Sequence, residues 1–406
     1  MFNSRMLVLL LLIPALAGPI LPEKIVLSIL LIILLVFAAS RKVSLAINDV
    51  DFETSIFNTL LFASVVYFST FFGVPESIVL AALFIVAAYE FKGVSLQNIG
   101  VFTVFGLAYF LYYHQVTSTP IDYNMLFFLS LIGGLTAALV ESIDVSSDKR
   151  ATMLLAVATV YLIFDIYKFN VDSYDLAIAF LIAFLLSMAA MKSGIADESG
   201  LMSATLVGTL VIVFTRIEFF LLLVTFYLVG SVSTKYKYAY KREQGVAEPA
   251  GGARGYANVF GNSLAPLFFA MTYGVYGHEV FLLGFVASVA AALGDTMASE
   301  IGKASGKVYL ITNLSRVRPG ISGGVSVRGE LAALLGVIII AIAAYPLNIL
   351  STWQYILVAL VAGFIAIHVD SVLGATVEEK GYLTNSGVNF LATLSTGFFC
   401  YILLGY

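Results

Sequence analysis

The sequence predicts an all-α, polytopic integral membrane protein. Hydrophobic residues make up 60% of the 406 residues and charged residues only 11%, and the mean hydropathy is +0.99. Apolar runs long enough for a helix to cross a hydrocarbon core of about 30 Å recur along the whole chain. The polar gaps between these runs are too short for a soluble domain, so an active site would have to be built from loops and helix ends at the membrane.

About fifteen apolar segments are expected to form transmembrane helices. Polar residues, glycine or proline separate neighbouring segments, which sets their limits. In chain order, the expected spans are 6–21, 24–39, 56–72, 75–90, 98–116, 122–141, 149–167, 174–191, 198–214, 217–232, 255–275, 279–300, 330–348, 352–370 and 387–405.

The first segment also has features of a secretory signal peptide. Arg5 precedes a leucine-rich run, and Ala-Leu-Ala-Gly-Pro (15–19) follows it. A second apolar segment begins only a few residues later, which is typical of an ordinary transmembrane hairpin. We favour the hairpin, with cleavage as the alternative.

Basic residues indicate one orientation of the chain. With the N-terminus inside, nearly all lysines and arginines lie in inner loops, and the outer loops hold only Lys24, Lys168 and Arg216. Positive charge collects on the cytoplasmic side of membrane proteins. We therefore expect a cytoplasmic N-terminus and a site that faces the cytoplasm, with the protein in the cell membrane. The longest polar loops would all face the cytoplasm: 232–254, 303–329 and 371–385.

Polar motifs that could form an active site are concentrated in the second part of the chain. Residues 1–175 are expected to form a membrane domain without a catalytic role, and residues 176–406 a membrane-embedded catalytic domain. The single cysteine, Cys400, excludes an intramolecular disulfide and is expected to be a buried, inert thiol.

Acidic residues mark two of the predicted cytoplasmic helix ends. Asp295 lies on a helical stripe of small residues, where an aspartate is costly unless it is paired or bound to a metal. Glu300 is about 140° around the helix from it, so one metal can use both only if the helix opens or water bridges them. Asp370-Ser371 repeats the acid–hydroxyl pattern of Asp295-Thr296. We predict Asp295, Glu300 and Asp370 as metal ligands, and counter-ions for nearby arginines as the alternative.

The loop 303–329 has features of a phosphate-binding site. Arg316, Arg318 and Arg328 flank Pro319-Gly320 and Gly323-Gly324, a stretch that cannot continue a helix and exposes backbone N–H groups. Guanidinium groups match phosphate oxygens, and glycines allow the chain to wrap around them. The alternative is that the three arginines are topology signals only.

Further candidate residues lie at neighbouring helix ends. Lys235 follows a Gly-Ser-rich helix end that can hold an anion through backbone N–H groups, although small residues for helix packing explain this end equally well. Arg254, Asn258 and Asn262 share one helical face, where amides can instead bond a neighbouring helix. The remaining candidates for substrate or nucleotide binding are Ser299, Gly320, Gly323, Gly324, Ser326, Asn385 and Asn389.

Taken together, motifs over roughly 195–406 resemble an integral-membrane family, that of plant phytyl-phosphate kinase and its human transmembrane-protein relative. The sequence departs from the family pattern at Met297, Asn258 and the turn 384–386, without losing a metal acid or a phosphate-binding arginine. The resemblance is carried by Gly208-Thr209-Leu210, Gly230-Ser231 with Thr234-Lys235, Arg254 with Asn262, Gly294-Asp295-Thr296 with Ala298-Ser299-Glu300, the run from Arg316 to Ser326, and Asp370-Ser371 with Leu373-Gly374-Ala375-Thr376.

The first half weakly resembles the dolichol and phytol kinase group. The likeness consists of Ala137–Ser142 followed by Asp144 and Asp148. The kinase-type Gly-Asp motif is missing from 1–170, and Lys149-Arg150 stands where that group continues with acids and asparagine. This half is interpreted as a degenerate, non-catalytic relative or an unrelated membrane scaffold.

The main resemblance implies phosphoryl transfer from a nucleotide, with CTP as a candidate, to an isoprenyl monophosphate. It implies Mg²⁺ as the cofactor, and an isoprenyl phosphate lipid, a nucleoside triphosphate and membrane lipids as partners, with no nucleic acid. Residue chemistry fits this, because both substrates are polyanions whose repulsion must be offset by cations. The residues assigned to catalysis are Asp295, Lys235, Arg316, Arg318 and Arg328, with Asp295, Asp370 and Glu300 on the metal.

Two other functions remain open from the sequence. A lipid-phosphate cytidylyltransferase would use the same substrates and similar residues, but would release pyrophosphate and form a CDP-lipid. A membrane transporter is compatible with many spans and possible repeats. Transporters usually place polar residues near the bilayer midplane, whereas the acids here lie at predicted cytoplasmic helix ends.

Overall fold

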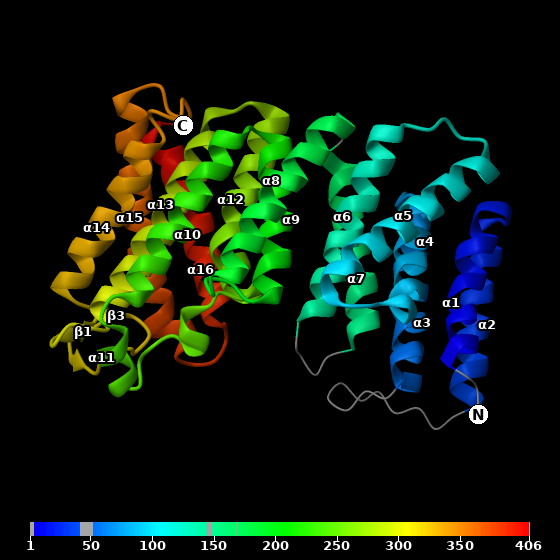
Figure 1. Ribbon diagram of the computed structural model, residues 1–406, viewed down its shortest axis with the longest axis horizontal. Coiled ribbons are helices and arrows are strands. Elements are labelled where there is room, and N and C mark those ends of the chain that lie inside the picture. Colours follow the sequence, from blue (N-terminus) through cyan, green and yellow to red (C-terminus); the bar gives the residue numbers. More distant parts are fainter. Residues whose placement is uncertain (1–3, 41–51, 144–147, 168, 406) are drawn as a thin grey trace. The chain divides into compact units, whose positions relative to one another are not determined.

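The chain is almost entirely helical, as the sequence predicts (Figure 1). The computed structural model describes residues 4–40, 52–143, 148–167 and 169–405. Arg41, Lys42 and Lys168, which entered the topology prediction, and Asp144 of the weak resemblance lie outside the described residues. Every predicted span coincides with an α-helix to within a few residues, which confirms the all-α, polytopic architecture.

The chain divides into two compact units, residues 1–177 and 178–406. Short 3-10 segments at 18–20, 69–72 and 88–91 extend the helix ends of the first unit. Its helices are α1 (Ser4–Ala17), α2 (Glu23–Ser40), α3 (Phe52–Phe68), α4 (Glu76–Ala87), α5 (Ser95–Thr117), α6 (Tyr123–Ser142), α7 (Lys149–Tyr167) and the beginning of α8 (Ser173–Lys192).

The second unit contains the remaining helices and a small sheet. The strands β1 (Val308–Leu310), β2 (Arg316–Val317) and β3 (Gly324–Val325) pair antiparallel in the order β2-β1-β3. No pattern in the sequence predicts this sheet. The helices are α9 (Glu198–Phe214), α10 (Ile217–Lys235), α11 (Tyr238–Glu243), α12 (Tyr256–Tyr276), α13 (Glu279–Gly302), α14 (Val327–Ala343), α15 (Trp353–Leu373) and α16 (Asn385–Leu403).

Within the described ranges, nine helices are long and apolar enough to cross a membrane, and shorter apolar helices lie at 10–20 and 198–214. Some predicted spans form helices below the length of a full crossing: α4 has 12 residues and α14 has 17. About 20 residues are needed to cross the hydrocarbon core without thinning or tilting. The polytopic architecture therefore combines full-length and shorter apolar helices.

Helix α13 is the core of the second unit. It contacts α10, α12, α14, α15 and α16, and 83% of its apolar 18-residue stretch is buried. Small residues allow this approach. A Cβ added to Gly294 would lie 2.4 Å from Ile367 Cδ1 and 2.9 Å from the Ala333 carbonyl oxygen. Asp295 is thus carried on the most enclosed helix of the unit.

Polar caps set where three helices of this unit begin. Asp197, Ser326 and Thr384 accept hydrogen bonds from backbone N–H groups three residues further on, at 2.8, 3.1 and 3.3 Å. Such caps satisfy donors that the helix itself leaves free. They fix the beginnings of α9, α14 and α16.

The three longest polar loops gather at one end of the second unit. Residue 254 forms a short parallel bridge with Ala196, Lys241 contacts Glu300, and Gly323 approaches the backbone of Ser371. Figure 1 shows α11 and the strands at this end, which we call the polar end. The loops that the sequence predicted to share one side are therefore together.

Replacing Gly294 by alanine is expected to destabilise the protein by about 1–3 kcal/mol, because the new methyl group has no room between α13, α14 and α15. Thermal unfolding of the purified protein in detergent measures this loss. Gly306→Ala is the matched control, since nothing lies within 4 Å of that Cβ position. Equal unfolding temperatures for the two variants would refute the close packing at Gly294.

Candidate functional site

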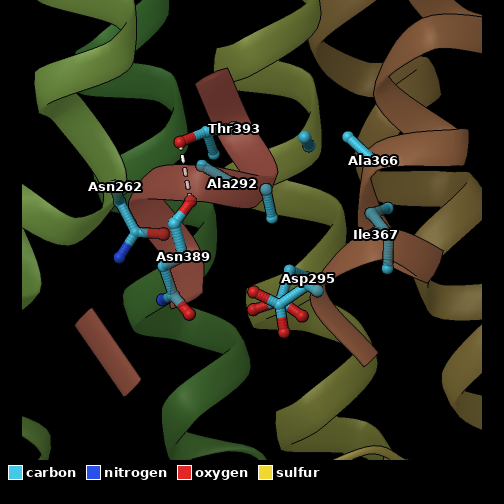
Figure 2. A pocket seen from close by; sticks show the side chains of 10 residues that line it. Asn262, Ala292, Asp295, Ala366, Ile367, Asn389 and Thr393 are labelled. Atoms are coloured by element: carbon cyan, nitrogen blue, oxygen red, sulfur yellow. Dashed lines mark hydrogen bonds between the residues drawn. The ribbon is translucent and has the colours of Figure 1, made fainter. Parts of the chain in front are cut away.

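A pocket lies between four helices of the second unit. Each helix contributes a polar lining residue: Asn262 of α12, Asp295 of α13, Asp370 of α15, and Asn389 with Thr393 of α16. Figure 2 shows Asn262 and Asn389 on one side, Ala366 and Ile367 on the other, and Asp295 between them. The fold therefore brings together four predicted site residues that are far apart in the sequence.

The small side chains of three alanines leave space in the pocket beside Asp295 and Asp370. Ala291, Ala292 and Ala366 line the pocket and are fully buried. Larger side chains at these positions would fill the space between α13 and α15. The stripe of small residues that the sequence indicates on the span 279–300 thus opens onto the second acid, Asp370.

The side-chain amides of Asn389 and Asn262 are held by hydrogen bonds to backbone carbonyl oxygens and, for Asn389, to Asp370 as well. With its nitrogen turned toward its acceptors, the Asn389 side chain donates to Asp370 Oδ2 at 3.2 Å and to the Asn385 carbonyl oxygen at 3.0 Å. The Asn262 Nδ2 donates to the Asn258 carbonyl oxygen at 2.9 Å. This leaves the Asn262 amide oxygen as an acceptor beside the pocket.

The donor set of the pocket suits a hard divalent cation. Mg²⁺ prefers oxygen ligands and is commonly bound by one or two carboxylates together with water and substrate phosphates. In the part of the chain that the structure describes, no cluster of three or more acidic, histidine or cysteine side chains could hold a metal. Asp295 and Asp370 thus fit Mg²⁺ only with ligands from the substrate, and the metal assignment stays a prediction.

Glu300 does not line this pocket. Its side chain is 3% exposed and accepts a hydrogen bond from Lys241, which is fully buried, and another from Lys303 Nζ at 3.0 Å. Lys241 also donates to the Thr234 carbonyl oxygen at 2.7 Å, and Lys303 to Glu248 Oε1 at 2.7 Å. These ion pairs anchor the segment 236–253 to the end of α13, whereas metal binding by Glu300 stays a prediction.

Electrostatics keep the outer pair of this network charged. Burial alone would lower the pKa of Lys303, but Glu300 and Glu248 outweigh it, and the pKa is raised. Burial alone would raise the pKa of Glu248, but Lys303 outweighs it, and the pKa is lowered. Both shifts favour the ionised pair.

The glycine-rich turn 320–324 packs directly on the helix end that follows Asp370. Gly323 has a φ of +75°, and a Cβ there would lie 2.4 Å from Ala375 Cβ and 2.6 Å from the Ser371 carbonyl oxygen. Ser322 Oγ donates to Glu378 Oε1 at 3.0 Å. Residues 374–378 form a π-helical turn, a feature often found at functional sites.

The predicted backbone donors of this turn are partly used. The Gly324 N–H donates to the Ile321 carbonyl oxygen at 3.0 Å. Gly320 has a φ of +88°, and a Cβ there would lie 2.9 Å from Val246 Cγ1 of the anchored segment. The glycines therefore serve close backbone approach, and phosphate binding by them stays a prediction.

The other predicted residues lie outside the pocket. Ser326 is buried and committed to capping α14, since its Oγ accepts from the Gly329 N–H at 3.1 Å and donates to Ser305 Oγ at 3.3 Å. Besides Gly320 and Gly324 of the turn, the exposed members of the predicted set are Lys235, Asn258, Ser299, Arg316, Arg318, Arg328 and Asn385.

Arg254 is buried at the beginning of α12. Its backbone N–H donates to the Ile195 carbonyl oxygen at 2.9 Å, and its carbonyl oxygen accepts from the Asp197 N–H at 3.2 Å. The guanidinium carbon lies 5.1 Å from the ring centroid of Phe226 and 5.5 Å from that of Tyr227. Burial lowers the pKa of this guanidinium.

Sequence reasoning missed the contribution of Lys241, Glu248 and Lys303. The position of Lys241 and Lys303 in inner loops predicts only their side of the membrane, and no local spacing relates Lys241 to Glu300, 59 residues away. Thr393, which lines the pocket, was also missed. Its position one helical turn after Asn389 was the available signal.

Comparison with known proteins places this second unit in a family. The sequence profile described as "Integral membrane protein DUF92" matches residues 181–397. The chain belongs to this family. The matched DUF92 region includes Asp295, Asp370, Asn262 and Asn389.

Relatives come from archaea, cyanobacteria and plants. The chain is 30% identical over 223 residues to the uncharacterized membrane protein MJ0933 of Methanocaldococcus jannaschii, covering 55% of this chain and 91% of that protein. It is 38% identical over 179 residues to the uncharacterized membrane protein sll0875 of Synechocystis sp., covering 43% of this chain and 69% of that protein. It is 35% identical over 220 residues to the chloroplastic protein VTE6 of Arabidopsis thaliana, covering 52% of this chain and 66% of that protein. No solved structure matches the chain.

Lys241→Met is expected to lower the free energy of unfolding by about 3–5 kcal/mol, because it removes one partner of the buried Glu300. Thermal unfolding in detergent measures the effect. Arg242→Met, at the exposed neighbouring position of α11, is the matched control. A loss no greater than that of the control would show that the Lys241–Glu300 pair does not anchor α11.

The Glu248–Lys303 pair is expected to stabilise the protein over the whole neutral range. The lowered pKa of Glu248 means that its contribution is lost only as the pH falls below the ordinary range of a glutamate, and the raised pKa of Lys303 means a loss only as the pH rises above the ordinary range of a lysine. The unfolding temperatures of wild type and Glu248→Gln should therefore differ by a constant amount between about pH 5 and pH 9. A difference that changes around neutral pH would contradict this assignment.

Proposed function

We propose that this DUF92 protein transfers a phosphoryl group from a nucleoside triphosphate, with CTP as the first candidate, to an isoprenyl monophosphate. The observation that carries the proposal is the meeting of Asp295 and Asp370 in one pocket, beside the glycine-rich turn 320–324. The similarity to the chloroplastic protein VTE6 and the motifs that resemble phytyl-phosphate kinase support it.

The chemistry requires positive charge more than a base. An oxygen of the lipid phosphate attacks the γ-phosphorus of the nucleotide and forms a new P–O bond, while the bond from that phosphorus to the oxygen bridging to the β-phosphate breaks. The nucleoside diphosphate leaves with the electron pair of that bond. The attacking oxygen is already ionised at neutral pH, so the protein has to align two polyanions and offset their repulsion.

Asp295 and Asp370 would hold Mg²⁺, which when bound supplies charge stabilisation to the phosphate oxygens it contacts. Asn389 donates to Asp370 and so fixes the orientation of that carboxylate. The Asn262 amide oxygen can accept from a substrate hydroxyl or a metal-bound water. The exposed Lys235, Arg316, Arg318 and Arg328 supply cations on the water-facing side.

The location at helix ends suits a lipid acceptor. The helices α13, α15 and α16 carry Asp295, Asp370 and Asn389 close to the polar end, and their remaining length is apolar. A long isoprenyl tail can then stay in the bilayer while its phosphate reaches a water-soluble nucleotide. We propose the cytoplasm as the compartment that supplies the nucleotide.

We propose no catalytic role for the first unit. Several charged side chains near its helix ends are engaged within the unit. Arg150 pairs with Glu90, Lys92 pairs with Glu141 at 3.1 Å, and Asp148 accepts a hydrogen bond from Ser55 at 2.6 Å. Such mutual neutralisation is typical of a structural network, and it leaves these groups with little free charge for a substrate phosphate.

Asp295→Asn and Asp370→Asn are each expected to lower turnover roughly 100-fold or more, because each removes a charge that balances the reacting phosphates through the metal. The measurement uses purified full-length protein in nanodiscs with Mg²⁺, CTP or ATP, and geranylgeranyl or phytyl monophosphate. Lipid and nucleotide products are identified by mass spectrometry. Glu218→Gln, in the first turn of α10, is the matched acid control and should keep full activity.

The products also separate the alternatives. Prenyl diphosphate with nucleoside diphosphate supports the kinase, whereas a CDP-lipid with pyrophosphate would assign a cytidylyltransferase. Full turnover in folded Asp295→Asn protein would exclude the proposed site. No product from any lipid and nucleotide pair, in protein shown to be folded, would make transport the leading function.

A further inference from the structure

Arg254 presents a buried positive charge that forms no ion pair within the described part of the chain, although Glu248 and Glu300 act on it from beyond contact distance. Only 6% of the residue is exposed, and its Nη1 is buried without a hydrogen-bond partner. None of the ion pairs formed between described residues includes it. A buried charge is costly unless it is paired, so this guanidinium provides a site for an anion.

The surroundings fix the guanidinium in place. The rings of Phe226 and Tyr227 lie against it at 5.1 and 5.5 Å and offset part of the loss of water. A Cβ at Gly230 would stand 2.6 Å from Arg254 Nη2, so a larger residue there would displace the guanidinium. The Arg254 backbone is also hydrogen-bonded to residues 195–197.

The guanidinium lies beside the helical turn that carries the first acid. The position of a Gly230 Cβ is 3.4 Å from Thr296 Cγ2 as well as 2.6 Å from Arg254 Nη2. Thr296 directly follows Asp295 in α13. An anion bound to Arg254 would therefore be next to the pocket of Asp295 and Asp370.

We infer that Arg254 binds the phosphate monoester of the lipid acceptor, whereas the exposed Arg316, Arg318 and Arg328 bind the nucleotide. This division of the two substrates rests on the proposed function. The guanidinium fork matches phosphate oxygens, and its aromatic walls exclude water.

The placement of each cation favours one source of phosphate. On α10, which provides the walls around Arg254, the apolar residues Leu228 and Val232 are 54% and 72% exposed, as expected for a face turned to lipid. The arginines of the loop 316–328 are exposed at the polar end, where a nucleotide arrives from water.

Direct binding tests this division without relying on turnover. Purified full-length protein is titrated with geranylgeranyl monophosphate, with geranylgeraniol as the ligand that has the same tail and no phosphate, and separately with CTP and Mg²⁺. Arg254→Gln is expected to weaken binding of the lipid phosphate roughly 10-fold or more and to leave CTP affinity within about twofold. Arg328→Gln should show the opposite pattern. Arg216→Gln, an exposed arginine that donates to the Asn348 carbonyl oxygen, is the matched control.

A second variant keeps the test decisive if Arg254→Gln does not fold. Gly230→Ala retains the charge of Arg254 but displaces its guanidinium. This variant should therefore weaken binding of the lipid phosphate to a similar extent. Wild-type affinity for geranylgeranyl monophosphate in both folded variants, or a larger loss for CTP, would overturn the inference. If the wild-type protein binds neither geranylgeranyl monophosphate nor CTP, both the inference and the proposed function are wrong. If the wild-type protein transfers phosphate from CTP to the lipid and the variants still bind the lipid phosphate, only the role of Arg254 is wrong.

Discussion

The close approach of α13 to its neighbours is the constraint on which the second unit depends. Gly294 and Gly336 bring the backbones of α13 and α14 together, and Ala291, Ala292 and Ala366 leave space between α13 and α15. Without a hydrophobic driving force between helices in lipid, such contact is stabilised by dispersion between small, complementary surfaces. The same small residues line the pocket that Asp295 and Asp370 share, so packing and chemistry are inseparable here.

Charge burial is handled in two different ways near this core. Glu300 has two lysines, and its charge is fully compensated inside the protein. Arg254 lies against aromatic rings, pairs directly with no acid, and keeps Nη1 without a hydrogen-bond partner, so we assign the remaining compensation to a bound group. The first arrangement stabilises a loop, and the second reserves a place for a ligand, although both lie within the same polar end.

The sequence specified the helices well because the length of an apolar run determines where a helix can stay in lipid. It also identified Asp295, Asp370, Asn262 and Asn389, since polar groups on apolar helices are rare enough to mark a site. It could not predict that these four meet, because that depends on contacts between segments as far apart in the sequence as Asn262 and Asn389. The strands β2 and β3 were missed since two-residue strands carry no periodicity, and the Lys241–Glu300 pair was missed since it has no local spacing.

The anchored segment 236–253 has a consequence for the dynamics of the polar end. A loop of this length on a membrane protein would ordinarily exchange its amide hydrogens quickly, because few of its backbone bonds survive small fluctuations. Here its helix α11 is tied through a fully buried lysine to the last turn of α13. Opening α11 requires separation of a buried ion pair, so its amides should exchange slowly and together with the end of α13. The segment therefore behaves as part of the scaffold of the polar end.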